Sequence, residues 1–180
     1  MKLSTQCFAI ALVASAVLPS SSLAASNTFL DHDFELGPST GFTYWAEFSS
    51  HGFPLIGAWG VLSPGNTSAW LGGVDDETST IIQEVDVEIS MTKFLFDHHI
   101  EAWETCGANG DLLTVTVENP NTKTTVTGYF GACHGTTTSG WTNEWLPMVA
   151  SPGDSLIITF SFWNNSSDPS SVYIDNISTI

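Results

Sequence analysis

Two stretches of the chain alternate between apolar and polar residues with a period of two. In residues 82–89, one face carries Gln83, Val85, Val87 and Ile89, and the other carries Ile82, Glu84, Asp86 and Glu88. In residues 94–103, one face carries Phe94, Phe96, His98, Ile100 and Ala102, and the other carries Leu95, Asp97, His99, Glu101 and Trp103. Because successive side chains of a strand point to opposite faces, both stretches are predicted to be β-strands with one buried face.

The remaining chain also reads as short strands, and no stretch shows an apolar repeat of 3.6 residues. Segments rich in Val, Ile, Thr, Phe and Trp are separated by turns that contain Gly, Pro, Asn or Asp. The predicted strands are 42–48, 54–61, 79–89, 92–103, 111–118, 124–130, 142–149, 154–163 and 171–179. Short strands at this spacing predict an all-β fold, a two-sheet antiparallel β-sandwich of the jelly-roll type.

The first 24 residues have the order of a secretory signal peptide. Lys2 supplies a positive charge, Cys7 to Leu18 form an apolar run, and Ser22-Leu23-Ala24 places small residues where a signal peptidase reads them. A membrane anchor needs about 18 or more apolar residues, which this run does not reach. We therefore expect residues 1–24 to be removed, residues 25–180 to form one domain, and the mature protein to be secreted, extracellular or periplasmic, without membrane insertion.

The charge of the chain excludes one class of partner. There are 19 acidic residues against three lysines, no arginine, and a net charge of −16. Nucleic-acid affinity comes largely from basic side chains that displace counterions from phosphates. We therefore expect no nucleic-acid partner, and the acidity suits solubility in salty or calcium-rich surroundings that screen self-repulsion.

Two cysteines remain once Cys7 is removed with the signal peptide. Cys106 and Cys133 form an even pair in an exported protein, and a disulfide between them is predicted to stabilise the fold by roughly 3 kcal/mol. Two free thiols are the alternative. A zinc site with Cys133, His134 and His98 or His99 is poorly supported, because no Cys-x-x-Cys or His-x-x-x-His spacing is present.

The polar face of residues 94–103 has the materials of a sugar-binding surface. An indole such as Trp103 stacks on the apolar side of a pyranose, and short polar side chains bond its hydroxyls. The candidate ligand-binding residues are Asp97, His99, Glu101 and Trp103. The alternative is a solvated outer face with one exposed Trp. His98, on the apolar side, is expected to be a buried structural histidine.

Glu84-Val85-Asp86-Val87-Glu88 resembles the Glu-x-Asp-x-Glu catalytic strand of jelly-roll β-glucanases, in which the first Glu is the nucleophile and the last is the acid/base. Residues four apart on a strand are separated by about 13 Å, whereas a retaining glycosidase holds its two carboxyl groups about 5 to 5.5 Å apart. We therefore interpret the acidic side chains as the solvent face of an edge strand, charged against aggregation. Catalysis by Glu84, Asp86 and Glu88 stays open as an alternative.

Two acidic motifs lie at opposite ends of the predicted domain, namely Asp33-Phe34-Glu35-Leu36-Gly37 and Tyr173-Ile174-Asp175-Asn176-Ile177-Ser178. Terminal strands of a sandwich commonly lie side by side, so Glu35 and Asp175 are placed to share one hard cation. With Trp70-Leu71-Gly72-Gly73, these motifs resemble the galactose-binding-like jelly-roll domains of secreted bacterial proteins, including carbohydrate-binding modules and MAM-like domains. The resemblance covers residues 27–180.

This resemblance implies a structural calcium ion bound by Asp33, Glu35 and Asp175. It also implies core positions for Trp45, Trp70 and Trp141. Four tryptophans are left over, and we expect one or two of them at a recognition surface: Trp59, Trp103, Trp145 and Trp163.

The sequence as a whole predicts a secreted, calcium-stabilised, non-catalytic module that binds a polysaccharide or another extracellular surface. Two alternatives remain: a jelly-roll glycoside hydrolase that uses Glu84, Asp86 and Glu88, and an adhesive or structural extracellular subunit. An oligomeric state is not indicated.

Overall fold

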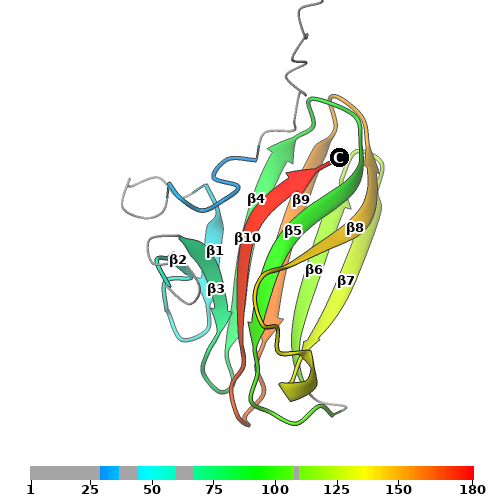
Figure 1. Ribbon diagram of the computed structural model, residues 1–180. Coiled ribbons are helices and arrows are strands. Elements are labelled where there is room, and N and C mark those ends of the chain that lie inside the picture. Colours follow the sequence, from blue (N-terminus) through cyan, green and yellow to red (C-terminus); the bar gives the residue numbers. More distant parts are fainter. Residues whose placement is uncertain (1–28, 37–43, 60–66, 108–109) are drawn as a thin grey trace, which may run out of the picture.

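The computed structural model describes residues 29–36, 44–59, 67–107 and 110–180, and it consists of two antiparallel sheets packed face to face (Figure 1). Sheet A contains, in spatial order, β1 (Ala46–Ser49), β4 (Thr78–Asp86), β9 (Ser155–Trp163), β6 (Asp111–Asn119) and β7 (Thr124–Ala132). Sheet B contains β2 (Ile56–Gly57), β3 (Ser68–Gly72), β10 (Ser171–Thr179), β5 (Met91–Glu101) and β8 (Thr142–Ala150). The predicted two-sheet β-sandwich is confirmed. Among the described residues there is no helix with the length and apolarity of a membrane span.

One strand, β3, is absent from the sequence-based prediction. Four of its five residues are buried, so it shows no alternation of apolar and polar positions. Gly72 ends this strand with φ +90°, and a Cβ there would lie 2.5 Å from the carbonyl oxygen of Ser170. The Trp-Leu-Gly-Gly motif therefore marks a strand that approaches its neighbour too closely for any side chain at position 72. Residues 42–43 and 60–61 of two predicted strands lie outside the described residues.

The core between the sheets is rich in aromatic side chains. Phe94 and Phe96 of β5 lie against Phe160 of β9, with ring centroids 6.1 and 5.3 Å apart. Trp45 is fully buried in the same cluster, which confirms its predicted core position, and its indole N–H donates to the carbonyl of Asp31 at 3.2 Å. This bond holds the chain around Asp31 against the core.

The predicted faces of the two alternating stretches are confirmed by burial. Val85 and Val87 face the core, whereas the three carboxylates of that stretch are exposed. His98 is buried as predicted, with its ring 6.0 Å from Phe96 and 5.8 Å from Phe130. His99, predicted on the polar outer face, is also buried, because the segment before β8 covers it.

Three interpretations of the sequence are wrong. Trp70 and Trp141 do not lie in the core between the sheets: Trp70 packs outside sheet B with its ring 5.0 Å from Trp59, and Trp141 is exposed. The core positions of both residues were taken from the motifs of the resembling family, and a short motif does not define which face of a strand is buried. β4 is not an edge strand over its first half, because β1 pairs with Ser79 to Ile82.

Candidate functional site

A cleft of about 490 Å³ opens where β5 ends on the outer face of sheet B. Its walls come from the end of β5 with the residues that follow it, and from the short 3₁₀ helix η2 (His134–Thr136) with the segment leading to β8. The lining residues are His99, Glu101, Ala102, Trp103, His134, Thr137 and Thr138. Three of the four predicted ligand-binding residues are thus brought together.

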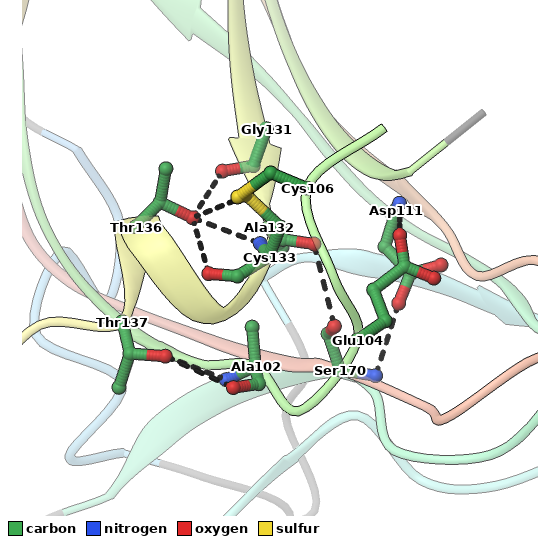
Figure 2. The surroundings of a disulfide bond; sticks show 10 residues. All are labelled: Ala102, Glu104, Cys106, Asp111, Gly131, Ala132, Cys133, Thr136, Thr137 and Ser170. Carbon is green, nitrogen blue, oxygen red and sulfur yellow. Dashed lines mark hydrogen bonds between the residues drawn. A yellow bond between two sulfur atoms is a disulfide. The ribbon is translucent and has the colours of Figure 1, made fainter. Parts of the chain in front are cut away.

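Threonine hydroxyls hold the second wall against β5. The N–H of Thr138 donates to the carbonyl of Ile100 at 3.0 Å, and the N–H of Ile100 donates to the Thr138 hydroxyl at 3.0 Å. The hydroxyl of Thr137 donates to the carbonyl of Ala102 at 3.0 Å and accepts from its N–H at 3.3 Å (Figure 2). β8 stops pairing with β5 at His98, so these threonines continue the edge of the sheet in its place.

A disulfide links Cys106, which follows the first wall of the cleft in the chain, to Cys133, which directly precedes the second (Figure 2). The predicted pairing is confirmed. Beside it, the hydroxyl of Thr136 lies 2.7 Å from the carbonyl oxygen of Gly131 and 2.9 Å from that of Cys133, which share its one hydrogen, and it accepts from the Cys133 N–H. These contacts fold the chain back at η2. The N–H of His134 donates to the carbonyl of Glu104 at 2.7 Å. Both walls of the cleft are therefore joined covalently as well as by hydrogen bonds.

His99 is the most deeply buried polar side chain of the cleft lining, with 4% of its surface exposed. Its Nδ1 lies 2.7 Å from the Thr138 hydroxyl and 3.2 Å from the carbonyl oxygen of Gly140. The other ring nitrogen, Nε2, lies 3.5 Å from a carboxylate oxygen of Glu101.

Tyr173 of β10 stacks against His99, with ring centroids 5.8 Å apart. Burial, and then the charge of Glu101, raise the pKa of Tyr173 to about 12. The phenol is therefore protonated at neutral pH and acts as a hydrogen-bond donor. Glu101 therefore lies beside two buried polar side chains, the imidazole of His99 and the phenol of Tyr173.

Trp103 lies at the rim of the cleft, and 76% of its surface is exposed. It follows the last residue of β5 by two positions, where the chain leaves the sheet. An exposed indole beside a cleft of hydroxyl, imidazole and carboxylate groups offers an apolar platform with hydrogen-bonding partners next to it.

Asp97, the fourth predicted ligand-binding residue, does not line the cleft. It lies on β5 two positions before His99, and it pairs with Asp175 of β10. Its carboxylate accepts from the side-chain amides of Asn143 at 2.8 Å and Asn176 at 3.0 Å. Asp97 therefore belongs to a separate acidic cluster.

Sequence reasoning missed the residues of the second wall, which are His134, Thr137 and Thr138. Their contacts with β5 are long-range and follow no periodic pattern. The available signal was the predicted disulfide, because Cys133 immediately precedes this segment.

The acidic cluster surrounds Asp175, which is 6% exposed at a β-bulge in the pairing of β10 with β5. Burial raises the pKa of Asp175 to about 6, against a hydrogen bond from the Asn176 N–H, and the charges of Asp33, Glu35 and Asp97 raise it further. The N–H of Ile177 donates to the carbonyl of His32, which brings the first acidic motif beside β10. The two terminal motifs are thus adjacent.

The chemistry of this cluster fits a hard cation. It collects carboxylate groups around a buried carboxyl group, and oxygen is the ligand that such cations prefer. In the part of the chain that the structure describes, no three side chains of His, Cys, Asp or Glu are grouped closely enough to hold a metal ion by themselves. Binding would thus require main-chain or water oxygens in addition.

Glu84, Asp86 and Glu88 are exposed on or beyond the outer face of sheet A. The pairing of β4 with β9 runs from Thr78 to Asp86 without a register shift, so no bulge draws the carboxylates together. Glu84 accepts a hydrogen bond from the Ser155 hydroxyl at 2.8 Å.

Of the tryptophans that the resemblance left over, Trp59 packs on Trp70, and the others are exposed. Trp145 lies on the outer face of sheet B with the ammonium group of Lys93 4.6 Å from its ring centroid. Trp163 lies on the opposite side of the molecule, at the end of β9.

A scan against protein-family models finds no match, and a search of curated proteins finds no relative. Solved structures do match. The carbohydrate-binding module TmCBM61, in a complex with β-1,4-galactotriose, has a TM-score of 0.61 at 14% identity, over 87% of this chain and 99% of that one. The family 11 module of the Clostridium thermocellum cellulase Lic26A-Cel5E (TM-score 0.45, 16% identity, 78% of this chain and 89% of that one) also matches. So does the CBM22-1 xylan-binding domain of Paenibacillus barcinonensis Xyn10C (TM-score 0.45, 14% identity, 82% and 90%). The fold of this chain is therefore the jelly-roll β-sandwich seen in carbohydrate-binding modules.

Proposed function

We propose that the protein is a non-catalytic module that binds a neutral polysaccharide in the cleft at the end of β5. The observation that carries this proposal is the exposed indole of Trp103 in one cleft with the buried imidazole of His99 and the half-exposed carboxylate of Glu101, which lie 3.5 Å apart. An indole stacks on the C–H face of a pyranose, and a carboxylate and a threonine hydroxyl bond its hydroxyl groups. The fold shared with TmCBM61, which was solved with β-1,4-galactotriose, supports a glycan as the ligand class.

The proposed ligand is uncharged. A chain with a net charge of −16 repels uronates and sulfated glycans, and Glu101 places one of these negative charges in the cleft itself. Affinity in the range from micromolar to millimolar is expected for one stacking contact and a few hydrogen bonds, which is about 4 to 8 kcal/mol.

Trp103→Ala tests the proposal, with Trp145→Ala as a matched control on the same outer face of sheet B. Binding is measured by affinity electrophoresis in gels that contain β-1,4-galactan, mixed-linkage β-glucan or xylan, with polygalacturonate as the acidic counterpart. We expect retardation by at least one neutral polymer that Trp103→Ala weakens and Trp145→Ala preserves. No retardation by any polymer, or equal retardation of both variants, would contradict the proposal.

Calcium is proposed as a structural ion at the acidic cluster. Asp33, Glu35 and Asp175 are the side chains assigned to it, and Asp97 adds charge beside them. The ion would neutralise carboxylates that otherwise repel one another, so its role is to stabilise the fold and not to contact the glycan.

Secretion is proposed from the first 24 residues and is supported by the disulfide, since disulfides persist in oxidising compartments. Intact-mass measurement of exported protein is expected to give an N-terminus at or within two residues of Ala25. Exported material that retains Met1 to Ala24 would refute it.

A further inference from the structure

The outer face of sheet A carries a regular arrangement of hydroxyl and aromatic side chains. Strand register places directly opposite residues on the same face, so the rows that cross the sheet follow from the pairing. The first row contains Phe48, Thr80, Ser161, Thr114 and Tyr129. The second contains Ala46, Ile82, Thr159, Thr116 and Thr127, and the third contains Thr78, Trp163, Leu112 and Gly131.

None of the residues in these three rows is charged, although the chain has a net charge of −16. Charge returns in the row beyond the second one, where Glu84 and Glu118 lie on either side of Ile157. The uncharged area therefore ends at a negatively charged border.

Three aromatic side chains stand out from this face. The exposed fractions are 59% for Phe48, 69% for Tyr129 and 46% for Trp163. Phe48 and Tyr129 are at opposite ends of one row, four strand spacings apart, which is about 19 Å. Such a distance matches an extended ligand of several sugar rings better than a single small molecule.

The hydroxyl groups between the aromatic side chains are only partly used within the protein. Thr80 and Ser161 lie 3.1 Å apart, and Thr116 and Thr127 lie 3.5 Å apart. Each hydroxyl has one donor and two acceptor positions, so a single mutual contact leaves capacity on the solvent side. Hydroxyls flanked by aromatic rings match the alternating hydroxyl and C–H surfaces of a polysaccharide.

We propose that this face is a second binding surface, distinct from the cleft, for an extended neutral polysaccharide. Glu84 and Glu118 at its border would repel an acidic polymer, and the absence of basic residues from the three rows disfavours a nucleic acid. The core of a protein–protein interface is depleted in Ser, whereas hydroxyl side chains occupy the middle of this face.

The two surfaces lie on opposite outer faces of the sandwich, so a trisaccharide cannot bridge them, whereas a polymer offers many sites to both. A polymer is therefore expected to be retained more strongly than a short oligosaccharide, through effective concentration.

The test uses the double variant Tyr129→Ala/Trp163→Ala, compared with Trp145→Ala, which removes an exposed aromatic residue from the other sheet. The probes are β-1,4-galactan and mixed-linkage β-glucan in native gels, and β-1,4-galactotriose in calorimetry. We expect the double variant to bind a neutral polymer about tenfold more weakly, because it removes two aromatic rings on which sugar rings would stack. Binding of the trisaccharide should not change.

A second variant, Thr116→Glu, introduces a charge into the second row without removing an aromatic ring, and it should weaken polymer binding in the same way. Unchanged polymer binding by both variants would overturn the inference while leaving the cleft proposal intact. Loss of polymer binding in these variants but not in Trp103→Ala would support this face and contradict the cleft. A melting temperature equal to that of the unmodified protein establishes that a variant is folded. If the double variant is not folded, the polymer binding of Thr116→Glu alone tests the inference.

Discussion

Asp97 of β5 and Asp175 of β10 are directly paired across two antiparallel strands, so two carboxylates project side by side from the outer face of sheet B. Like charges at such positions destabilise a sheet. Asn143 and Asn176 donate hydrogen bonds to Asp97, but Asp175 is buried with further carboxylates nearby. A cation at this cluster would relieve that repulsion.

The first prediction concerns calcium. Calcium at 100 times its dissociation constant should raise the free energy of unfolding by about 2.7 kcal/mol, since the ion binds the folded state alone. Asp175→Asn should abolish this gain, because it removes the buried carboxylate. Thermal unfolding with calcium and with a chelator measures it, and a melting temperature that does not change on chelation would refute the site.

The second prediction concerns pH without calcium. The pKa of Asp175 is about 6 in the folded protein and 3.8 as its ordinary value, so the folded state binds more protons between these pH values. Its contribution favours folding at low pH and is lost as the pH rises through about 6. At pH 7 in chelator, Asp175→Asn should therefore be more stable than the unmodified protein by about 3 kcal/mol.

The control for this prediction is the same comparison at about pH 3, below the ordinary pKa of 3.8, where the difference in stability should nearly vanish because Asp175 is then mostly protonated in both the folded and the unfolded state. Denaturant unfolding at a series of pH values provides the measurement. A variant that is less stable than the unmodified protein at pH 7 in chelator would contradict it.

The third prediction concerns His98. Burial, and then the neighbouring His99, lower its pKa below 6.5, while Asp97 opposes the shift. The unfolded state then binds more protons than the folded state just below pH 6.5, so this group contributes stability at higher pH that is lost as the pH falls.

His98→Phe should remove this acid sensitivity, because a phenyl ring suits the site between Phe96 and Phe130 and does not titrate. It also removes Nδ1, which has no hydrogen-bond partner in the structure. The comparison is made in an Asp175→Asn background, so that the opposite pH dependence of Asp175 does not mask it. Equal slopes of stability against pH in both proteins would count against the prediction.

The fourth prediction concerns the disulfide. Loss of the bond between Cys106 and Cys133 should cost roughly 3 kcal/mol and lower the melting temperature by several degrees. Because this bond joins the two walls of the cleft, Cys106→Ser/Cys133→Ser should also weaken polysaccharide binding at a temperature where the protein is still folded. Melting curves and affinity electrophoresis measure the two effects, and complete thiol labelling of the unreduced protein would refute the bond.

Periodicity predicted the parts of the fold that are buried on one face. The alternation around Val85 and Phe96 identified β4 and β5 with their inner faces, because one-sided burial leaves that pattern. It did not identify β3, which is buried on both faces, nor the outward position of Trp70. In the candidate site, Glu101 and Trp103 were predicted from one strand, whereas Thr137 and Thr138 were not, since their contacts depend on how a distant loop folds back.

The wall formed by residues 134–138 is attached to β5 through main-chain groups, two threonine hydroxyls and a disulfide. The side chain of His134 lines the cleft but takes no part in that attachment, which uses its main-chain N–H. Position 134 can therefore be exchanged with little loss of stability, and substitutions there would change the chemistry of the cleft directly.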